Sequence, residues 1–225
     1  MDGNGRWAKE RTFARIQGHR KGVESVRAVV RTSGELGIGF LTLYAFSQEN
    51  WSRPKREVDA LMALLEEFLV NEISELNENN VQLHAIGDLK ALPERVLAQL
   101  KKTKDATAHN TGLKLILALS YGARQEIVDA VKLISQEIVK HKLAPNEIDE
   151  KVFSQHLYTK EYPDPDLLIR TSGEMRISNF LLWQISYAEL VVSPVLWPDF
   201  RKEHYLEALQ EYAQRQRRYG GVGAK

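Results

Sequence analysis

Three short polar segments carry the side chains that are best suited to binding an anion. The first starts at Asp2 and sets Asn4 between two glycines, followed by Arg6. Glycines allow a tight turn whose N–H groups can face an anion, and a guanidinium can pair with two phosphate oxygens. Asp2 is a hard oxygen ligand of the kind that holds Mg²⁺ against phosphate. Arg15 and His19 can close over the same charge; a surface turn with a helix cap is the alternative.

The second polar segment runs from Ser47 to Pro54, directly after an apolar stretch that ends at Phe46. Pro54 can open a helix, and Ser47, Asn50 and Arg53 are spaced so that a loop entering this helix can point all three into one pocket. A serine that caps the helix is the alternative. A cap alone does not require an asparagine, a tryptophan and an arginine together, so the segment is also a candidate binding site.

The third polar segment follows a short apolar run and contains Arg170, Arg176 and Ser178. Two guanidiniums and a hydroxyl at the end of a buried strand again indicate capture of a diphosphate. Glu189 lies downstream among apolar residues, where a carboxylate is costly unless it is paired or bound to a metal. An ion pair with one of these two arginines is the alternative interpretation of Glu189.

The elements that must position these segments alternate along the chain. Apolar runs predict strands at residues 40–46, 81–86, 113–119 and 166–169, and helical apolar stripes cover residues 58–76, 127–138 and 206–213. Such alternation predicts an α/β fold with a mainly parallel central sheet flanked by helices. In open parallel sheets, ligands bind at the carboxyl ends of the strands, and two of the polar segments directly follow predicted strands. The 225 residues show no linker, so we expect a single domain.

Composition excludes several classes of protein. The chain has 31 basic and 30 acidic residues, a net charge of +1, so the whole molecule is not built to bind nucleic acid. It has no cysteine, which excludes a disulfide scaffold and a thiol nucleophile. No apolar run is long enough for a transmembrane helix, and there is no signal-peptide pattern. Residues 1–31 hold eight basic groups against three acids, which favours a local anion site.

Taken together, the motifs resemble those of the cis-prenyltransferases, most closely the bacterial undecaprenyl diphosphate synthases. The run Asp-Gly-Asn-Gly-Arg-Trp-Ala at residues 2–8 carries the resemblance, as does Arg-Ile-Ser-Asn-Phe at residues 176–180. Further matching runs lie at residues 18–19, 44–47, 49–51, 53–54, 86–88, 169–171, 173–174, 181–184, 187–190, 196–200 and 217–221. The runs follow the order and spacing of the family along nearly the whole chain, so residues 1–225 are identified as one cis-prenyltransferase domain.

The resemblance implies a Mg²⁺-dependent transferase that condenses an allylic diphosphate, usually farnesyl diphosphate, with successive isopentenyl diphosphates. Each new double bond is cis, and bacterial members make the undecaprenyl carrier lipid for cell-wall synthesis. It also implies a homodimer in the cytoplasm that works at the inner face of the membrane, with membrane contact through the lipid product only. The alternatives are a shorter-chain synthase, a non-catalytic regulatory subunit of the same fold and a phosphate-ester hydrolase.

Roles for individual residues follow from the same resemblance. Asp2 and Asn50 are the candidate catalytic residues, and Asp2 and Glu189 are the candidate metal ligands. The proton acceptor stays open between the Ser47 and Asn50 region and a diphosphate oxygen. The candidate substrate-binding residues are Gly3, Asn4, Gly5, Arg6, Trp7, Arg15 and His19 for the allylic diphosphate; Arg170, Arg176 and Ser178 for isopentenyl diphosphate; Ser47, Glu49, Trp51 and Arg53 in a loop over both; and Arg218 and Gly220, which reach the neighbouring subunit.

A growing isoprenoid also needs a hydrophobic tunnel. The candidate wall residues are Ala45, Leu61, Leu65, Val81, Leu83, Ile86 and Leu113, with ordinary core packing as the alternative for each. In the family an apolar strand precedes the Asp-Gly-Asn-Gly-Arg run, whereas here Met1 directly precedes Asp2. We therefore expect this strand to be missing, which would leave strand backbone groups unpaired beside its place.

Overall fold

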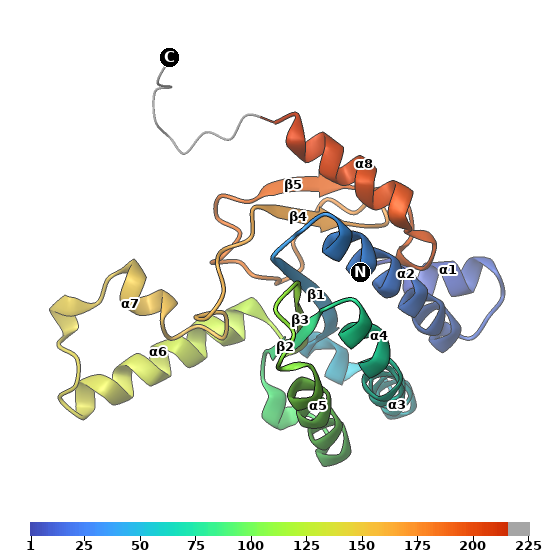
Figure 1. Ribbon diagram of the computed structural model, residues 1–225. Coiled ribbons are helices and arrows are strands. Elements are labelled where there is room, and N and C mark those ends of the chain that lie inside the picture. The colour runs from blue at the N-terminus through green and yellow to red at the C-terminus, as the bar shows by residue number, and fades with distance from the viewer. Residues whose placement is uncertain (216–225) are drawn as a thin grey trace.

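The computed structural model describes residues 1–215 and has the predicted α/β architecture (Figure 1). The strands are β1 (Phe40–Ser47), β2 (Gln82–Ile86), β3 (Lys114–Tyr121), β4 (Leu167–Arg170) and β5 (Glu189–Val192). The helices are α1 (Asn4–Glu10), α2 (Arg15–Glu35), α3 (Lys55–Asn71), α4 (Ile73–Glu78), α5 (Glu94–Thr107), α6 (Ala123–Val139), α7 (Glu150–Ser154) and α8 (Lys202–Ala213). Short 3₁₀ turns are η1 (Gln48–Ser52), η2 (Leu89–Ala91), η3 (Pro145–Glu147) and η4 (Trp197–Asp199).

The strands that the structure describes pair in parallel, as predicted, but they form two sheets. One sheet has the order β1-β3-β2, and the other contains β4 and β5. Strand β5 escaped the sequence analysis because it has only four residues and begins with Glu189. Strands β1 and β4 are each at the edge of their sheet, and both run toward the polar segments that follow them.

Strand β3 is the centre of the larger sheet and is buried on both faces, as its continuous apolar sequence indicates. Leu115, Leu117 and Leu119 pack into a core with α2, α3 and α5, whereas Ile116 and Ala118 face a second core at the start of α6. Helices α2 to α5 accordingly lie on one side of this sheet, and α6 runs outward on the other side (Figure 1). None of the helices within residues 1–215 has both the length and the apolar character that crossing a bilayer requires.

The start of the chain lies against α2 because two glycines of that helix leave room for it. A Cβ atom on Gly18 would lie 2.0 Å from the carbonyl oxygen of Asn4, and one on Gly22 would lie 2.7 Å from Asn4 Oδ1. The backbone at Gly3 has φ +107°, a conformation that favours glycine, and it turns the chain into α1. These glycines therefore fix the segment that carries Asp2.

Replacing Gly18 with alanine should displace this segment. The added methyl meets backbone rather than a flexible side chain, so we expect Gly18→Ala to lower the free energy of unfolding by about 1–3 kcal/mol. Gly34→Ala in the same helix is the control, because its nearest neighbour is 4.0 Å away. The control should be neutral or stabilising by about 0.5–1 kcal/mol. Urea unfolding measures both, and equal effects would contradict the proposed close packing.

Candidate active site

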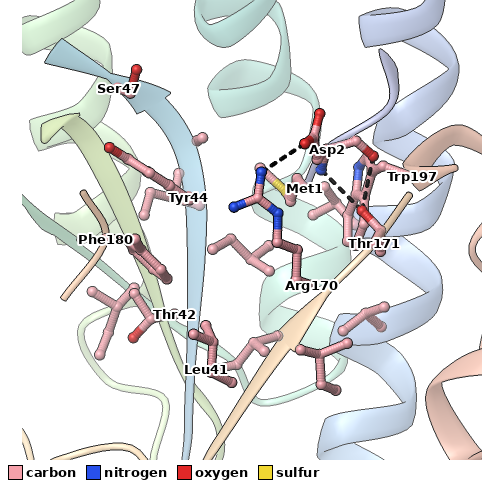
Figure 2. Close-up of a pocket in the computed structure, with 18 of the residues that line it drawn as sticks. Met1, Asp2, Leu41, Thr42, Tyr44, Ser47, Arg170, Thr171, Phe180 and Trp197 are labelled. Carbon is pink, nitrogen blue, oxygen red and sulfur yellow. Dashed lines mark hydrogen bonds and ion pairs between the residues drawn. The ribbon is translucent and has the colours of Figure 1, made fainter. Parts of the chain in front are cut away.

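One cavity of about 780 Å³ joins the three polar segments to the apolar core. It is lined by β1, β4, α2 and α3, and its polar residues gather where β1 and β4 end (Figure 2). The predicted site residues that line it are Asp2, Gly3, Asn4, Gly5, Arg15, His19, Ser47, Asn50, Arg53, Arg170, Arg176 and Ser178. The sequence analysis therefore selected side chains that the fold brings together from positions up to 176 residues apart along the chain.

Asp2 is held at the rim by contacts to its backbone and to its carboxylate. Thr171 Oγ1 donates to the Asp2 carbonyl (2.8 Å) and accepts from its N–H (2.9 Å), and the N–H of Trp197 donates to the same carbonyl (2.9 Å). Arg170 Nη2 donates to Asp2 Oδ2 (2.9 Å), and the Gly3 N–H donates to Oδ1 (2.7 Å) (Figure 2). Partial burial alone would raise the pKa of Asp2, but these hydrogen bonds and the Arg170 charge hold the pKa below its usual value.

Arg15 and Arg53 share one carboxylate that the sequence analysis missed. Glu57 Oε1 lies 2.9 Å from Arg53 Nη1 and 3.3 Å from Arg15 Nε, so a residue in the first turn of α3 holds both guanidiniums. Glu57 follows Arg53 by four residues, the spacing at which two charged side chains pair along a helix, and this spacing could have indicated the contact from the sequence. Nearby, burial together with the charges of Arg53 and Arg15 lowers the pKa of His19 to about 4, so its imidazole is neutral at pH 7.

The third polar segment is organised around Arg170. Its Nη1 donates to Ser178 Oγ (2.8 Å) and to the carbonyl of Arg176. The residue is mostly buried, and its Nε has no hydrogen-bond partner among the described residues. Arg176 pairs with Glu174, which also lies 3.0 Å from Arg6 Nη2. Arg170 therefore connects this segment to Asp2.

The remaining predicted site residues have other partners. Arg6 donates to Ser172 Oγ (2.6 Å) beside its ion pair with Glu174. Trp7 is buried and donates to Asp199 Oδ1 (2.8 Å), so the structure does not bring it into the cavity. Trp51 donates to Ser120 Oγ (2.9 Å), and Glu49 accepts from Asn179 (2.7 Å). Arg218 and Gly220 lie outside the described residues.

Glu189 does not lie beside Asp2 in the structure. It opens β5 opposite Leu167, whereas Arg170, which contacts Asp2, ends β4 three residues later, about 10 Å along the strand. Glu189 Oε2 lies 2.9 Å from Arg215 Nη1, so its observed partner is an arginine, but not one of the two arginines of the third segment that we weighed from the sequence. A role for Glu189 as a metal ligand stays a prediction.

The residues at the rim fit a magnesium ion held jointly with a diphosphate. Among residues 1–215 there is no group of three or more carboxylate or imidazole side chains that could bind a metal by themselves. Mg²⁺ commonly binds one or two protein oxygens together with substrate phosphates and waters. Asp2 supplies a carboxylate, and Asn4 Oδ1 is a buried oxygen in the same wall with no hydrogen-bond partner in the described structure.

The apolar lining of the cavity includes only some of the residues that we predicted for the tunnel wall. Its lining includes Val26, Leu41, Leu43, Ala45, Leu61, Leu65 and Phe68. Ala45, Leu61 and Leu65 were predicted, but Val81, Leu83, Ile86 and Leu113 do not line the cavity and are buried in the two cores. The reason is the strand order, which places β1 beside the cavity and β2 at the far edge against α4 and α5.

The structure is an α/β fold with basic side chains gathered at one end of an apolar cavity. A family model described as "Putative undecaprenyl diphosphate synthase" matches residues 1–220. The isoprenyl transferase of Bacillus subtilis is 52% identical over 222 residues, covering 99% of this chain and 85% of its own length. That of Geobacter sulfurreducens is 51% identical over 225 residues, covering 100% and 92%. The chain belongs to this prenyltransferase family and is a prenyl-transferring enzyme.

Solved structures agree with the family assignment. Lavandulyl diphosphate synthase from Lavandula x intermedia, solved in complex with dimethylallyl diphosphate, superposes with a TM-score of 0.95 at 39% identity, covering 98% of this chain and 95% of that one. A protein from Campylobacter jejuni described as a probable undecaprenyl diphosphate synthase gives a TM-score of 0.79 at 37% identity, covering 90% and 93%. The resemblance drawn from the sequence motifs is therefore confirmed.

The depressed pKa of His19 predicts how stability depends on pH. The unfolded imidazole titrates near pH 6.5, whereas the folded one titrates near pH 4, so the unfolded state binds more protons between these values. The free energy of unfolding is therefore not reduced by His19 above pH 6.5, and it falls as the pH drops from 6.5 toward 4. We expect the wild type to lose more stability than His19→Gln between pH 7 and pH 5 in urea unfolding; equal losses would contradict this assignment.

Proposed function

We propose that this enzyme elongates an allylic diphosphate, in the first place farnesyl diphosphate, with successive isopentenyl diphosphates, forming cis double bonds and ending at undecaprenyl diphosphate for the cell-wall carrier lipid. The observation that carries the proposal is the single cavity whose rim holds anion-binding side chains and whose interior is apolar. A prenyl diphosphate has the same division into a charged head and a hydrocarbon chain. The known relative bound to dimethylallyl diphosphate supports an allylic substrate.

In the proposed complex, the allylic diphosphate lies at Asn4, Gly5, Arg15, His19 and Arg53, and isopentenyl diphosphate lies at Arg170, Arg176 and Ser178. Cleavage of the allylic C–O bond places negative charge on the leaving diphosphate. Arg15 and Arg53 face this charge as it develops, which is where electrostatic stabilisation accelerates a reaction. Neutral His19 can donate a hydrogen bond to the diphosphate without adding a third positive charge.

Asp2 is the proposed anchor for Mg²⁺ on the diphosphate, and the lowered pKa keeps its carboxylate charged at neutral pH. The ion, when bound, supplies Lewis-acid stabilisation of the leaving diphosphate. Asn50 is held by the hydrogen bond from the Ser47 N–H to its Oδ1 (3.3 Å). The proton released after the double bond attacks the allylic cation goes to this Ser47 and Asn50 region or to a diphosphate oxygen.

The proposed assembly is a homodimer in the cytoplasm that meets the membrane through its product. Helix α6 projects from the sheet and exposes apolar residues along its length, which supports burial against a second subunit (Figure 1). These residues are Val128, Val131, Leu133 and Val139. Arg218 and Gly220 are the residues proposed to reach the neighbouring subunit's isopentenyl diphosphate.

Incubation with radiolabelled isopentenyl diphosphate, Mg²⁺ and a farnesyl or geranyl primer tests the function. Chromatography of the extracted lipids should show long labelled products. Labelled products of short, fixed length would favour the alternative of a shorter-chain synthase, and release of phosphate without lipid would favour a hydrolase. The cavity position of Asp2, Asn50 and Arg53 argues against a non-catalytic subunit, which would not need them there.

Removing the Asp2 carboxylate should lower turnover without unfolding the protein. We expect Asp2→Ala to reduce kcat about 10²- to 10³-fold, because one preorganised electrostatic group at the leaving diphosphate is lost. Steady-state kinetics at saturating Mg²⁺ measures the effect, and circular dichroism checks the fold. Asp59→Ala on the exposed face of α3 is the control and should keep normal turnover. Normal turnover of Asp2→Ala would refute the proposed role.

Narrowing the cavity at Ala45 should shorten the product. A leucine there occupies space in the apolar part that a growing chain needs, so we expect Ala45→Leu to give products several isoprene units shorter at nearly unchanged primer affinity. Ala85→Leu is the control, because Ala85 packs against the same core but does not line the cavity. Reversed-phase chromatography compares the products, and an unchanged length for Ala45→Leu would show that the chain does not pass this position.

A further inference from the structure

Asn179 lies where three segments meet, and two of them contribute residues to the proposed diphosphate pockets. Its Nδ2 donates to Glu49 Oε1 (2.7 Å) in η1, and its Oδ1 accepts from the N–H of Arg124 (2.9 Å) at the start of α6. Its own carbonyl accepts from the N–H of Ala123 (2.9 Å). Both polar atoms of the Asn179 side chain therefore bond to other segments of the chain, Nδ2 to η1 and Oδ1 to the start of α6.

Local packing fixes Asn179 in this position. Its backbone has φ +59°, a left-handed conformation that asparagine tolerates better than most residues. A Cβ atom on Gly122 would lie 2.9 Å from Asn179 Nδ2 and 3.3 Å from Gln48 Oε1, so the junction closes around a glycine. The amide thus has little room to move unless η1 or the segment after β4 moves with it.

The neighbours of the two bonded residues belong to different pockets. Asn50, next to Glu49, lines the cavity with Arg53, whereas Ser178, next to Asn179, lines it with Arg170 and accepts a hydrogen bond from that guanidinium (2.8 Å). Glu49 and Asn179 do not themselves line the cavity. Their bond is exposed to solvent and joins the two segments whose neighbouring residues line the cavity.

We infer that the bond between Asn179 and Glu49 couples the two diphosphate pockets, so that a ligand at Arg170 and Ser178 strengthens binding at Arg53 and Asn50. A ligand that fixes Ser178 also fixes Asn179 and, through the amide, Glu49 and η1. The second ligand then meets a loop that is already ordered and loses less conformational entropy on binding. Asn179 is a positioning residue in this role, since it acts through its neighbours. The inference rests on the proposed function for the identity of the two ligands.

The coupling is measured by binding alone. The saturated analogue isopentyl diphosphate has no double bond to attack the allylic cation, so it can be combined with farnesyl diphosphate without reaction. Calorimetric titration gives the dissociation constant of farnesyl diphosphate with and without saturating isopentyl diphosphate, and the ratio of the two is the coupling factor. We expect a factor of about 5 or more for the wild type, within the usual range for coupled sites.

Exchanging the amide of Asn179 and the carboxylate of Glu49, one at a time and together, tests whether their bond carries the coupling. Asn179→Asp keeps the acceptor for the Arg124 N–H and suits the left-handed backbone, but it sets a carboxylate against Glu49, so the coupling factor should fall to about 1. Glu49→Gln keeps an acceptor for Asn179 and should retain most of the coupling. In the double variant the bond can form in the opposite direction, so the coupling should return. Asn146→Asp, an exposed position in η3, is the control for the added charge.

The outcomes separate this inference from the proposed function. A coupling factor that is the same in the wild type and Asn179→Asp, or that stays near 1 in the double variant while urea unfolding is normal, would overturn the coupling. Absence of lipid products from the wild type in the elongation assay would instead contradict the proposed function. Restored coupling in the double variant supports the inference, because a purely structural defect at Asn179 would not be relieved by a second substitution in η1.

Discussion

The hydrogen-bonded ion pair between Asp2 and Arg170 is the contact on which the rest of the site depends. It joins residues 168 positions apart and unites the start of the chain with the end of β4. The same guanidinium reaches Ser178 with its other terminal nitrogen, so one side chain stands between the proposed metal anchor and the proposed isopentenyl diphosphate pocket. Loss of the Arg170 side chain would therefore raise the pKa of Asp2 and remove the donor to Ser178 at the same time.

Within residues 1–215, the five arginines proposed to bind the diphosphates are each paired with a carboxylate. Glu57 holds Arg15 and Arg53, Glu174 holds Arg6 and Arg176, and Asp2 holds Arg170. The pairs made by Glu57 and Glu174 are partly exposed, so each contributes little to stability and its rearrangement costs little, whereas Arg170 in the third pair is mostly buried. Because Arg15, Arg53, Arg170 and Arg176 line the cavity, these pairs hold four guanidiniums in its wall, where the proposed diphosphates would meet positioned donors.

Much of this arrangement could be predicted from sequence because apolar strands and the polar residues that follow them are local features. Because Asn50 and Arg53 lie between a predicted strand that ends at Phe46 and a predicted helix that begins after Pro54, we could place both in a loop at the end of the strand. Strand order is not local, and for this reason Val81 and Leu83 were placed in the tunnel although β2 lies at the far edge. Glu57 is the first of seven acids spread over residues 57–78, a distribution that is typical of a solvated helix face. The partner of Asn179 lies 130 positions away, and no spacing rule could have indicated it.

The end of β1 shows how the sheet itself creates both halves of the site. The register between β1 and β3 shifts twice between Tyr44 and Ser47, and Ala45 has no partner in β3. Such a bulge interrupts the alternation of side chains and redirects those that follow. As a result, Ala45 and Phe46 both face the core beneath α2 and α3, while Tyr44 packs in the other core. Ala45, Phe46 and Ser47 all line the cavity, so the bulge lets consecutive side chains at the end of β1 contribute both to its apolar wall and to its polar rim.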